Sequence, residues 1–130
     1  MQSYVLNRHP RKLYLWLERG DSFGDEWEID IPDYSGQGGP TALDADNANP
    51  RVTAQIRPTE DADEVLAEFD VRIIDAAART VQPYLTPEKT AGIGDEAVWD
   101  IQLRWDKVGT DDFVKTFLQG DVIIDRDVAR

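Results

Sequence analysis

The clearest pattern in the sequence is an alternation of apolar and polar positions over residues 97–106. Apolar side chains occupy every odd position from Ala97 to Trp105, whereas the even positions, apart from Val98, are polar or charged. Because side chains on a β-strand point alternately to its two faces, this segment predicts a strand with one buried side and one solvent-facing side. Trp99 and Trp105 bring a large apolar area to the buried side. We therefore expect a second sheet to cover this face.

Shorter alternations predict further strands on the N-terminal side of this segment. Residues 12–18 and 26–31 both alternate, and Arg19–Ser22 supplies a turn between them, so we expect these two strands to pair. Residues 51–57 form another predicted strand, which a proline bounds at each end. The inward positions expected in the first two strands are all apolar: Leu13, Leu15, Leu17, Trp27, Ile29 and Ile31.

Residues 64–82 fit two different periods. Every fourth residue from Val65 to Val81 is apolar, and the alanines of Ala76–Ala78 favour a helix. In the first half, however, the odd positions are all apolar and the even positions are mainly charged, which favours a strand. We interpret the region as a strand, with Asp75–Arg79 as the turn of a hairpin.

The following residues predict one helix and several strands. Pro83 interrupts the strand expected over residues 80–85 and predicts an edge position. A threonine N-cap, a proline at the first helical position and a glycine past the end are typical of a short helix near residues 87–92. The last expected elements are a hairpin turn at Asp106–Gly109 and strands at 113–119 and 122–124.

Many short strands separated by turn signals predict an all-β fold, an antiparallel β-sandwich of the immunoglobulin-like or jelly-roll type. A chain of 130 residues suits a single domain over residues 1–130. It has no cysteine, and its 26 acidic and 14 basic residues give a formal charge of −12, which argues against nucleic-acid and anionic-membrane partners. The sequence contains neither an apolar run of membrane-spanning length nor the pattern of a signal peptide, so we expect synthesis in a cytoplasm.

A long loop and one aromatic side chain are the candidate partner-binding features. The loop covers residues 33–49 and is rich in glycine, and loops of this length tend to be functional or mobile. Leu43 is its one candidate anchor to the core. Trp16 falls opposite the leucines of its strand, which predicts a surface or interface aromatic. The residues expected to bind a partner are Trp16, Gly36, Gly38 and Gly39.

The sequence contains no recognisable catalytic set. His9 is the one histidine, and it precedes a proline in a predicted turn. Because the sequence has one histidine and no cysteine, a zinc site built on histidine and cysteine is excluded. Asp44–Asn49 comes nearest to a calcium loop, but its later positions lack the required glycine and glutamate. Arg19–Asp21 matches an adhesion tripeptide, although turn chemistry explains it as well. We therefore expect no enzymatic activity, metal or cofactor, while a calcium site assembled from separate loops stays an alternative.

The order of several segments carries a family resemblance. These are Leu17–Phe23, Gln55–Arg57, Leu85–Ala91, Val98–Leu103 and Phe117–Val122, followed by Asp127–Val128. Together they resemble the small β-sandwich domain of tailed-phage baseplate and tail proteins, as in the N-terminal domain of the BppU upper-baseplate protein and in tail-fibre-complex proteins of actinobacterial phages. Unlike larger relatives, the sequence ends at Arg130, just after the sandwich, and its loop at residues 33–49 is longer than a minimal sandwich needs.

The resemblance implies a non-enzymatic structural subunit of a bacteriophage virion. Such a subunit would be a tail-tip, baseplate or tail-fibre adaptor that contacts other virion proteins and copies of itself, located in the virion tail after assembly in the host cytoplasm. The alternative is a carbohydrate-binding module that contacts host cell-wall glycans. That alternative requires two or more tryptophan or tyrosine side chains exposed on one face, whereas strand parity places Trp27, Trp99 and Trp105 inside.

Overall fold

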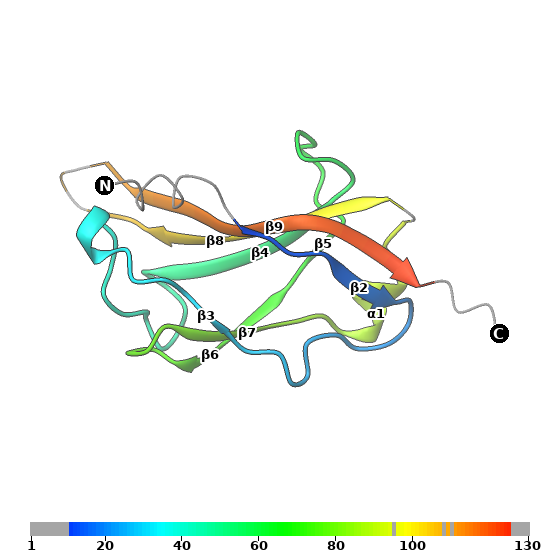
Figure 1. Cartoon of the computed structure of the whole chain (residues 1–130), viewed down its shortest axis with the longest axis horizontal. Helices are drawn as coiled ribbons and strands as arrows, with labels where there is room; N and C mark the ends of the chain where they lie inside the picture. The colour runs from blue at the N-terminus through cyan, green and yellow to red at the C-terminus, as the bar shows by residue number, and fades with distance from the viewer. Residues whose placement is uncertain (1–10, 95, 108, 110, 126–130) are drawn as a thin grey trace.

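The computed structural model confirms the predicted all-β sandwich. It describes residues 11–94, 96–107, 109 and 111–125. Figure 1 shows two layers, a large sheet with strand order β1-β9-β8-β4-β5, in which β2 also pairs with β9, and a small sheet with order β3-β7-β6. The elements are β1 (Arg11–Lys12), β2 (Leu15–Glu18), β3 (Ile29–Asp30), a 3₁₀ turn η2 (Ser35–Gln37), β4 (Arg51–Arg57), β5 (Ala67–Glu68), β6 (Asp70–Asp75), β7 (Thr80–Tyr84), α1 (Pro87–Ala91), β8 (Ala97–Trp105) and β9 (Phe113–Asp125).

The central strand of the large sheet is β8, the segment with the clearest alternation in the sequence. It lies between β4 and β9 and pairs antiparallel with both. Its inner positions Ala97, Trp99, Ile101 and Leu103 are buried, as predicted, because they face the small sheet across the core. Trp105, at the end of the strand, is half-buried. Alternation alone therefore identified the face around which the core is built.

The strand interpretation of residues 64–82 is confirmed, and the strand has a structural role that its pattern did not reveal. Its first part, β5, pairs with β4 in the large sheet, and its second part, β6, pairs with β7 in the small sheet. The segment therefore passes from one layer to the other and links the two sheets. Val65 was expected inside but is 40% exposed, because it precedes the first residue of β5.

The predicted pairing of residues 12–18 with 26–31 is wrong. β2 pairs with β9 in parallel within the large sheet, whereas β3 pairs with β7 in the small sheet. The chain crosses from one layer to the other between these strands. Leu15, Leu17, Ile29 and Ile31 are nevertheless buried, because the two strands face the same core from opposite sides. Leu13 is 39% exposed, since the strand predicted over residues 12–18 is interrupted between β1 and β2.

Pro83 does not mark an edge strand, because β7 lies between β3 and β6. β3 reaches only as far as Val81 on β7, and the irregular chain around Gly24 lies against the carbonyl of Pro83. On the β3 side of β7, therefore, no paired strand requires an N–H group from residue 83. Proline is therefore still at a position where its missing N–H costs no strand hydrogen bond, although the prediction that β7 is an edge strand was wrong.

The C-terminal strands and the helix follow the sequence more closely. The two strands expected over 113–119 and 122–124 are one continuous strand, β9, whose register against β8 shifts after Ile101. The predicted helix is α1, whose N-cap Thr86 accepts a hydrogen bond from the Lys89 N–H. The buried hydroxyl of Thr90 on this helix accepts from the Gly20 N–H at 3.1 Å and donates to the Asp21 carbonyl at 2.7 Å. Residues 19–21 are therefore a turn packed against α1.

Four aromatic rings form the centre of the core between the sheets. The ring centroid of Trp99 on β8 lies 5.8 Å from that of Trp27 and 6.1 Å from that of Phe69. The ring centroids of Phe23 and Trp27 are 5.3 Å apart. Because Gly120 of β9 has no side chain, the backbone of Leu13 can pack against it at the point where β1 gives way to β2. The indole Nε1–H of Trp99 donates to the Leu13 carbonyl at 2.7 Å, which satisfies its one polar atom.

A side chain at residue 120 should disrupt this contact. An added Cβ at Gly120 would lie 2.3 Å from the Leu13 carbonyl oxygen, so we expect Gly120→Ala to lower the free energy of unfolding by about 1–3 kcal/mol. Gly36→Ala is the matched control, because its Cβ would meet no atom within 4 Å, and it should change stability by less than about 0.5 kcal/mol. Urea denaturation followed by tryptophan fluorescence measures both. Equal stability of the two variants would contradict the close packing of Leu13 on Gly120.

Candidate functional site

Trp16 is on the surface, as its position opposite the leucines predicted. Its side chain is 65% exposed on β2, the outermost strand of the large sheet at this point, where it lies opposite Ile123 of β9. Among the described residues, no strand pairs with the other side of β2. A shallow cavity of about 300 Å³ adjoins the indole and is lined by Trp16, Glu18, Asp21, Ser22 and Phe23. Trp16 therefore combines a protruding ring with a neighbouring hollow.

The glycines of the long loop do not share one environment. Gly36 and Gly38 are exposed on and just after the 3₁₀ turn, but Gly39 is buried against Tyr34 and Phe113. Gly39 therefore packs against the core, and only Gly36 and Gly38 of the three predicted glycines are open to a partner. The tight fit explains why residue 39 is a glycine, because a Cβ there would lie 2.7 Å from the Cβ of Tyr34.

The loop over residues 33–49 is anchored at several points. Leu43 is buried, as predicted, and its N–H donates to the Ala76 carbonyl at 2.9 Å. The guanidinium of Arg79 donates to the carbonyls of Ile31 and Thr41, both at 3.0 Å. The side chain of Asp33 accepts from the Ser35 N–H, and this hydrogen bond lowers its pKa. These contacts give the exposed glycines a defined support.

The structure does not bring Trp16 and the loop glycines together. Gly39 packs on Phe113 at the start of β9, whereas Trp16 lies opposite Ile123 near its end. Because a strand rises about 3.3 Å per residue, these two ends of β9 are about 30 Å apart. The predicted binding residues therefore form two separate surfaces, at opposite ends of the large sheet (Figure 1).

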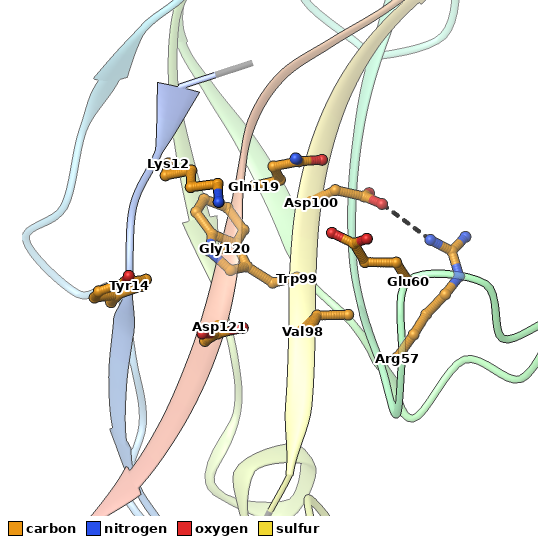
Figure 2. Close-up of a pocket in the computed structure, with 10 residues that line it drawn as sticks. All are labelled: Lys12, Tyr14, Arg57, Glu60, Val98, Trp99, Asp100, Gln119, Gly120 and Asp121. Atoms are coloured by element: carbon orange, nitrogen blue, oxygen red, sulfur yellow. Dashed lines mark hydrogen bonds and ion pairs between the residues drawn. The ribbon is translucent and has the colours of Figure 1, made fainter. Parts of the chain in front are cut away.

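A polar depression that the sequence analysis did not identify lies on the outer face of the large sheet (Figure 2). It has a volume of about 260 Å³ and crosses from β1 over β9 and β8 to the end of β4. In Figure 2, Lys12 and Tyr14 lie to one side of β9, while Arg57 and Glu60 lie beyond β8. The lining residues are Lys12, Tyr14, Arg57, Glu60, Val98, Trp99, Asp100, Gln119, Gly120 and Asp121.

A second depression of about 390 Å³ continues the first along the sheet. Both are bordered by Glu60, Val98 and Asp121, and the second adds the acidic side chain of Glu96. Pro58 and Thr59, which follow β4 directly, form its other wall. We call the two depressions together the trough. It is an open, polar surface whose floor is made by the two longest strands of the fold.

One ion pair lies at the side of the trough. Arg57 and Asp100 are joined at 3.0 Å, with exposed side-chain fractions of 26% and 25%. The Arg57 guanidinium also contacts the Gln55 side chain. Burial raises the pKa of Asp100 above its ordinary value, and the charge and hydrogen bond of Arg57 oppose this shift only in part. By contrast, the side chains of Lys12, Glu60 and Asp121 make no hydrogen bond or ion pair with any described residue.

The calcium-like segment that the sequence contains does not form a metal site in the described structure. Asp44, the first residue of the nearest calcium-like segment, accepts hydrogen bonds from the Asp46 and Asn49 N–H groups, which lower its pKa and fold the segment into a turn. No cluster of metal-ligating side chains occurs within the part of the chain that the structure describes, and none of the helices there is long and apolar enough to cross a membrane. His9 lies outside the described residues.

The charge of Asp100 should affect stability in a pH-dependent way. A carboxyl whose pKa is higher in the folded than in the unfolded state makes the protein less stable as pH rises between those two values. We therefore expect Asp100→Asn to raise the free energy of unfolding at about pH 7. The difference should vanish near about pH 3, below the ordinary aspartate pKa, because the carboxyl is then protonated in both states.

Urea denaturation at several pH values checks this expectation. Asp106→Asn is the matched control, because it removes the carboxylate of the more exposed pair that Asp106 forms with Arg51 at 2.8 Å. Such exposed pairs contribute little, so this variant should match the natural protein or be slightly less stable. A loss of stability on Asp100→Asn at about pH 7 would show that attraction to Arg57 outweighs the cost of burial.

Comparison with known proteins does not identify the family of this chain. Neither a scan against protein-family models nor a search of curated proteins finds a match. The resemblance to phage β-sandwich domains therefore stays a prediction from the sequence. The surfaces available for a functional proposal are Trp16 on β2, the exposed loop glycines and the trough.

Proposed function

We propose that this protein is a non-enzymatic structural subunit of a bacteriophage virion, an adaptor in the tail tip, baseplate or tail-fibre complex. It acts by contacting neighbouring virion proteins and copies of itself. The observation that carries the protein-binding part of the proposal is the 65% exposure of Trp16 on β2, which pairs only with β9 among the strands that the structure describes. The phage context rests on the sequence resemblance alone.

The physical case for docking at β2 has two parts. A tryptophan that is exposed in the isolated chain can bury a large area against a partner, and tryptophan is enriched among residues that dominate binding energy. An edge strand can also accept a strand from another chain through backbone hydrogen bonds. At β2 both features occur together, beside the hollow that Trp16 shares with Phe23.

The second exposed feature suits a subunit that joins two neighbours. Gly36 and Gly38 lie at the opposite end of the large sheet from Trp16, on a loop that hydrogen bonds hold in place. Because the sheet between them is continuous, contacts at its two ends would hold two partners at a fixed separation. The net charge of −12 disfavours nucleic acid and anionic membranes as those partners.

A carbohydrate-binding module is the second candidate function. It requires two aromatic side chains exposed on one face, and Tyr14 and Trp16 are 57% and 65% exposed at alternate positions of one segment. Strand parity puts both of these residues on the outward side of the segment. They line different hollows, so a carbohydrate site beside Tyr14 and a docking role of Trp16 can coexist.

Replacement of Trp16 tests the docking role in assembled particles. We expect Trp16→Ala to abolish or strongly reduce incorporation into purified virions without unfolding the subunit, because its side chain makes few contacts within the chain. Ile74→Ala is the matched control, since Ile74 is an apolar side chain, 48% exposed, on β6 of the small sheet. Mass spectrometry of the virions measures incorporation, and thermal unfolding of the purified variants checks the fold.

Two results would contradict the proposal. If the natural protein is absent from purified virions, the assignment to the particle is wrong. If Trp16→Ala is incorporated as well as Ile74→Ala, the protein does not dock through β2. Electron microscopy of virions with the natural protein labelled would then show whether it lies in the tail at all.

A further inference from the structure

We propose that the trough on the outer face of the large sheet binds an uncharged glycan, with Tyr14 as the ring on which a sugar stacks. This binding site is separate from the docking surface at Trp16 and does not depend on it. The proposal gives the second candidate function a defined place, on β1, β9, β8 and the end of β4. The observations that carry it are the exposed ring of Tyr14, the unused hydrogen-bonding capacity of the lining side chains and the carboxylates that disfavour an anionic ligand.

Tyr14 supplies the stacking surface. Its side chain is 57% exposed, borders the trough together with Lys12 and Asp121, and makes no hydrogen bond within the described chain. The C–H groups on one face of a pyranose ring form an apolar patch, which an aromatic face can cover while the sugar hydroxyls stay hydrated at the edges. Tyrosine also keeps a hydroxyl that can donate or accept a hydrogen bond.

The polar groups around Tyr14 match a ligand with many hydroxyls. Each hydroxyl both donates and accepts, so it needs acceptors and donors in the same site. Among the residues that the structure describes, nothing occupies the carboxylate acceptors of Glu60 and Asp121 or the ammonium donor of Lys12. Hydrogen bonds in which one partner is charged are the stronger kind, which favours specific binding in an otherwise wet groove.

The charges of the trough disfavour an anionic ligand. The trough contains four carboxylates, from Glu60, Glu96, Asp100 and Asp121, which would repel an anionic ligand such as a phosphate. Lys12 and Arg57 are the two cations of the trough and lie at opposite sides of the same floor. Because Asp100 is paired with Arg57, three carboxylates and Lys12 remain, so a basic peptide is the competing ligand that the titration has to distinguish from a neutral glycan.

The shape of the trough favours a short chain of sugars over a single ring. Its two depressions, of about 260 and 390 Å³, share Glu60, Val98 and Asp121 and so form one continuous surface. Small-molecule sites commonly have about 300–1,000 Å³. The floor consists of β8 and β9, next to each other in the sheet, so Asp100, Gln119 and Asp121 are held on paired strands before a ligand arrives.

Titration with defined oligosaccharides tests the proposal. The probes are chitotetraose and maltotetraose, with tetralysine as the charged competitor, and binding to the folded full-length chain is measured by calorimetry and NMR. We expect at least one oligosaccharide to bind and Tyr14→Ala to weaken it by at least about tenfold, the size expected when a stacked ring is lost. Glu60→Gln and Asp121→Asn should weaken binding less, because an amide oxygen still accepts a hydrogen bond.

Trp16→Ala is the matched control for the stacking residue. It removes an aromatic side chain of similar exposure from the same segment but outside the trough, so it should leave glycan affinity unchanged. Loss of virion incorporation with retained glycan binding would then identify Trp16 as the docking residue alone. The failure of one proposal is in this way distinguishable from the failure of the other.

Three outcomes would overturn the glycan site. The first is that neither oligosaccharide binds at millimolar concentration. The second is that tetralysine binds and the oligosaccharides do not, which makes the trough a surface for basic peptides. The third is that Trp16→Ala weakens glycan binding as much as Tyr14→Ala. Thermal unfolding of Tyr14→Ala checks that its exposed side chain can be removed without loss of the fold.

Discussion

The burial of the Trp99 indole between two sheets is the constraint on which the rest of this structure depends. Its ring packs against Trp27, which precedes β3, and against Phe69, which lies between β5 and β6, and its N–H donates to the Leu13 carbonyl. A buried indole without a partner for its N–H would lose the free energy of a hydrogen bond to water. The backbone at Leu13 therefore has to lie close to β9, and Gly120 makes that approach possible.

This arrangement also determines which side chains reach the surface. Between Lys12 and Leu15 the chain leaves regular pairing with β9, and Tyr14 is exposed at this interruption. The outward positions of β9 place Gln119 and Asp121 in the depression that Tyr14 borders, and Asp100 of β8 lies further across it. The polar trough is thus the outer side of the strands whose inner side forms the aromatic core.

The functional surfaces depend differently on distant parts of the chain. The exposure of Trp16 follows from the alternation of its own strand, whereas the trough requires four strands to bring Lys12, Arg57 and Asp121 to one surface. Alternation on β8 could have placed Asp100 on an outer face. It could not have placed Tyr14 near that residue, because nothing in residues 12–18 indicates parallel pairing with β9. The loop glycines show the same limit, since the burial of Gly39 depends on Phe113.

The sequence by itself determined the all-β class, the strands at residues 51–57 and 97–105, the short helix after Thr86 and the exposure of Trp16. These features follow from side-chain periodicity and local capping, which act between near neighbours in the chain. The tertiary structure decided which strands pair, where β5 and β6 pass between sheets, and how the trough is assembled. Such pairings join residues far apart in sequence, and a strand with one apolar face can bury it equally well in either layer of a sandwich.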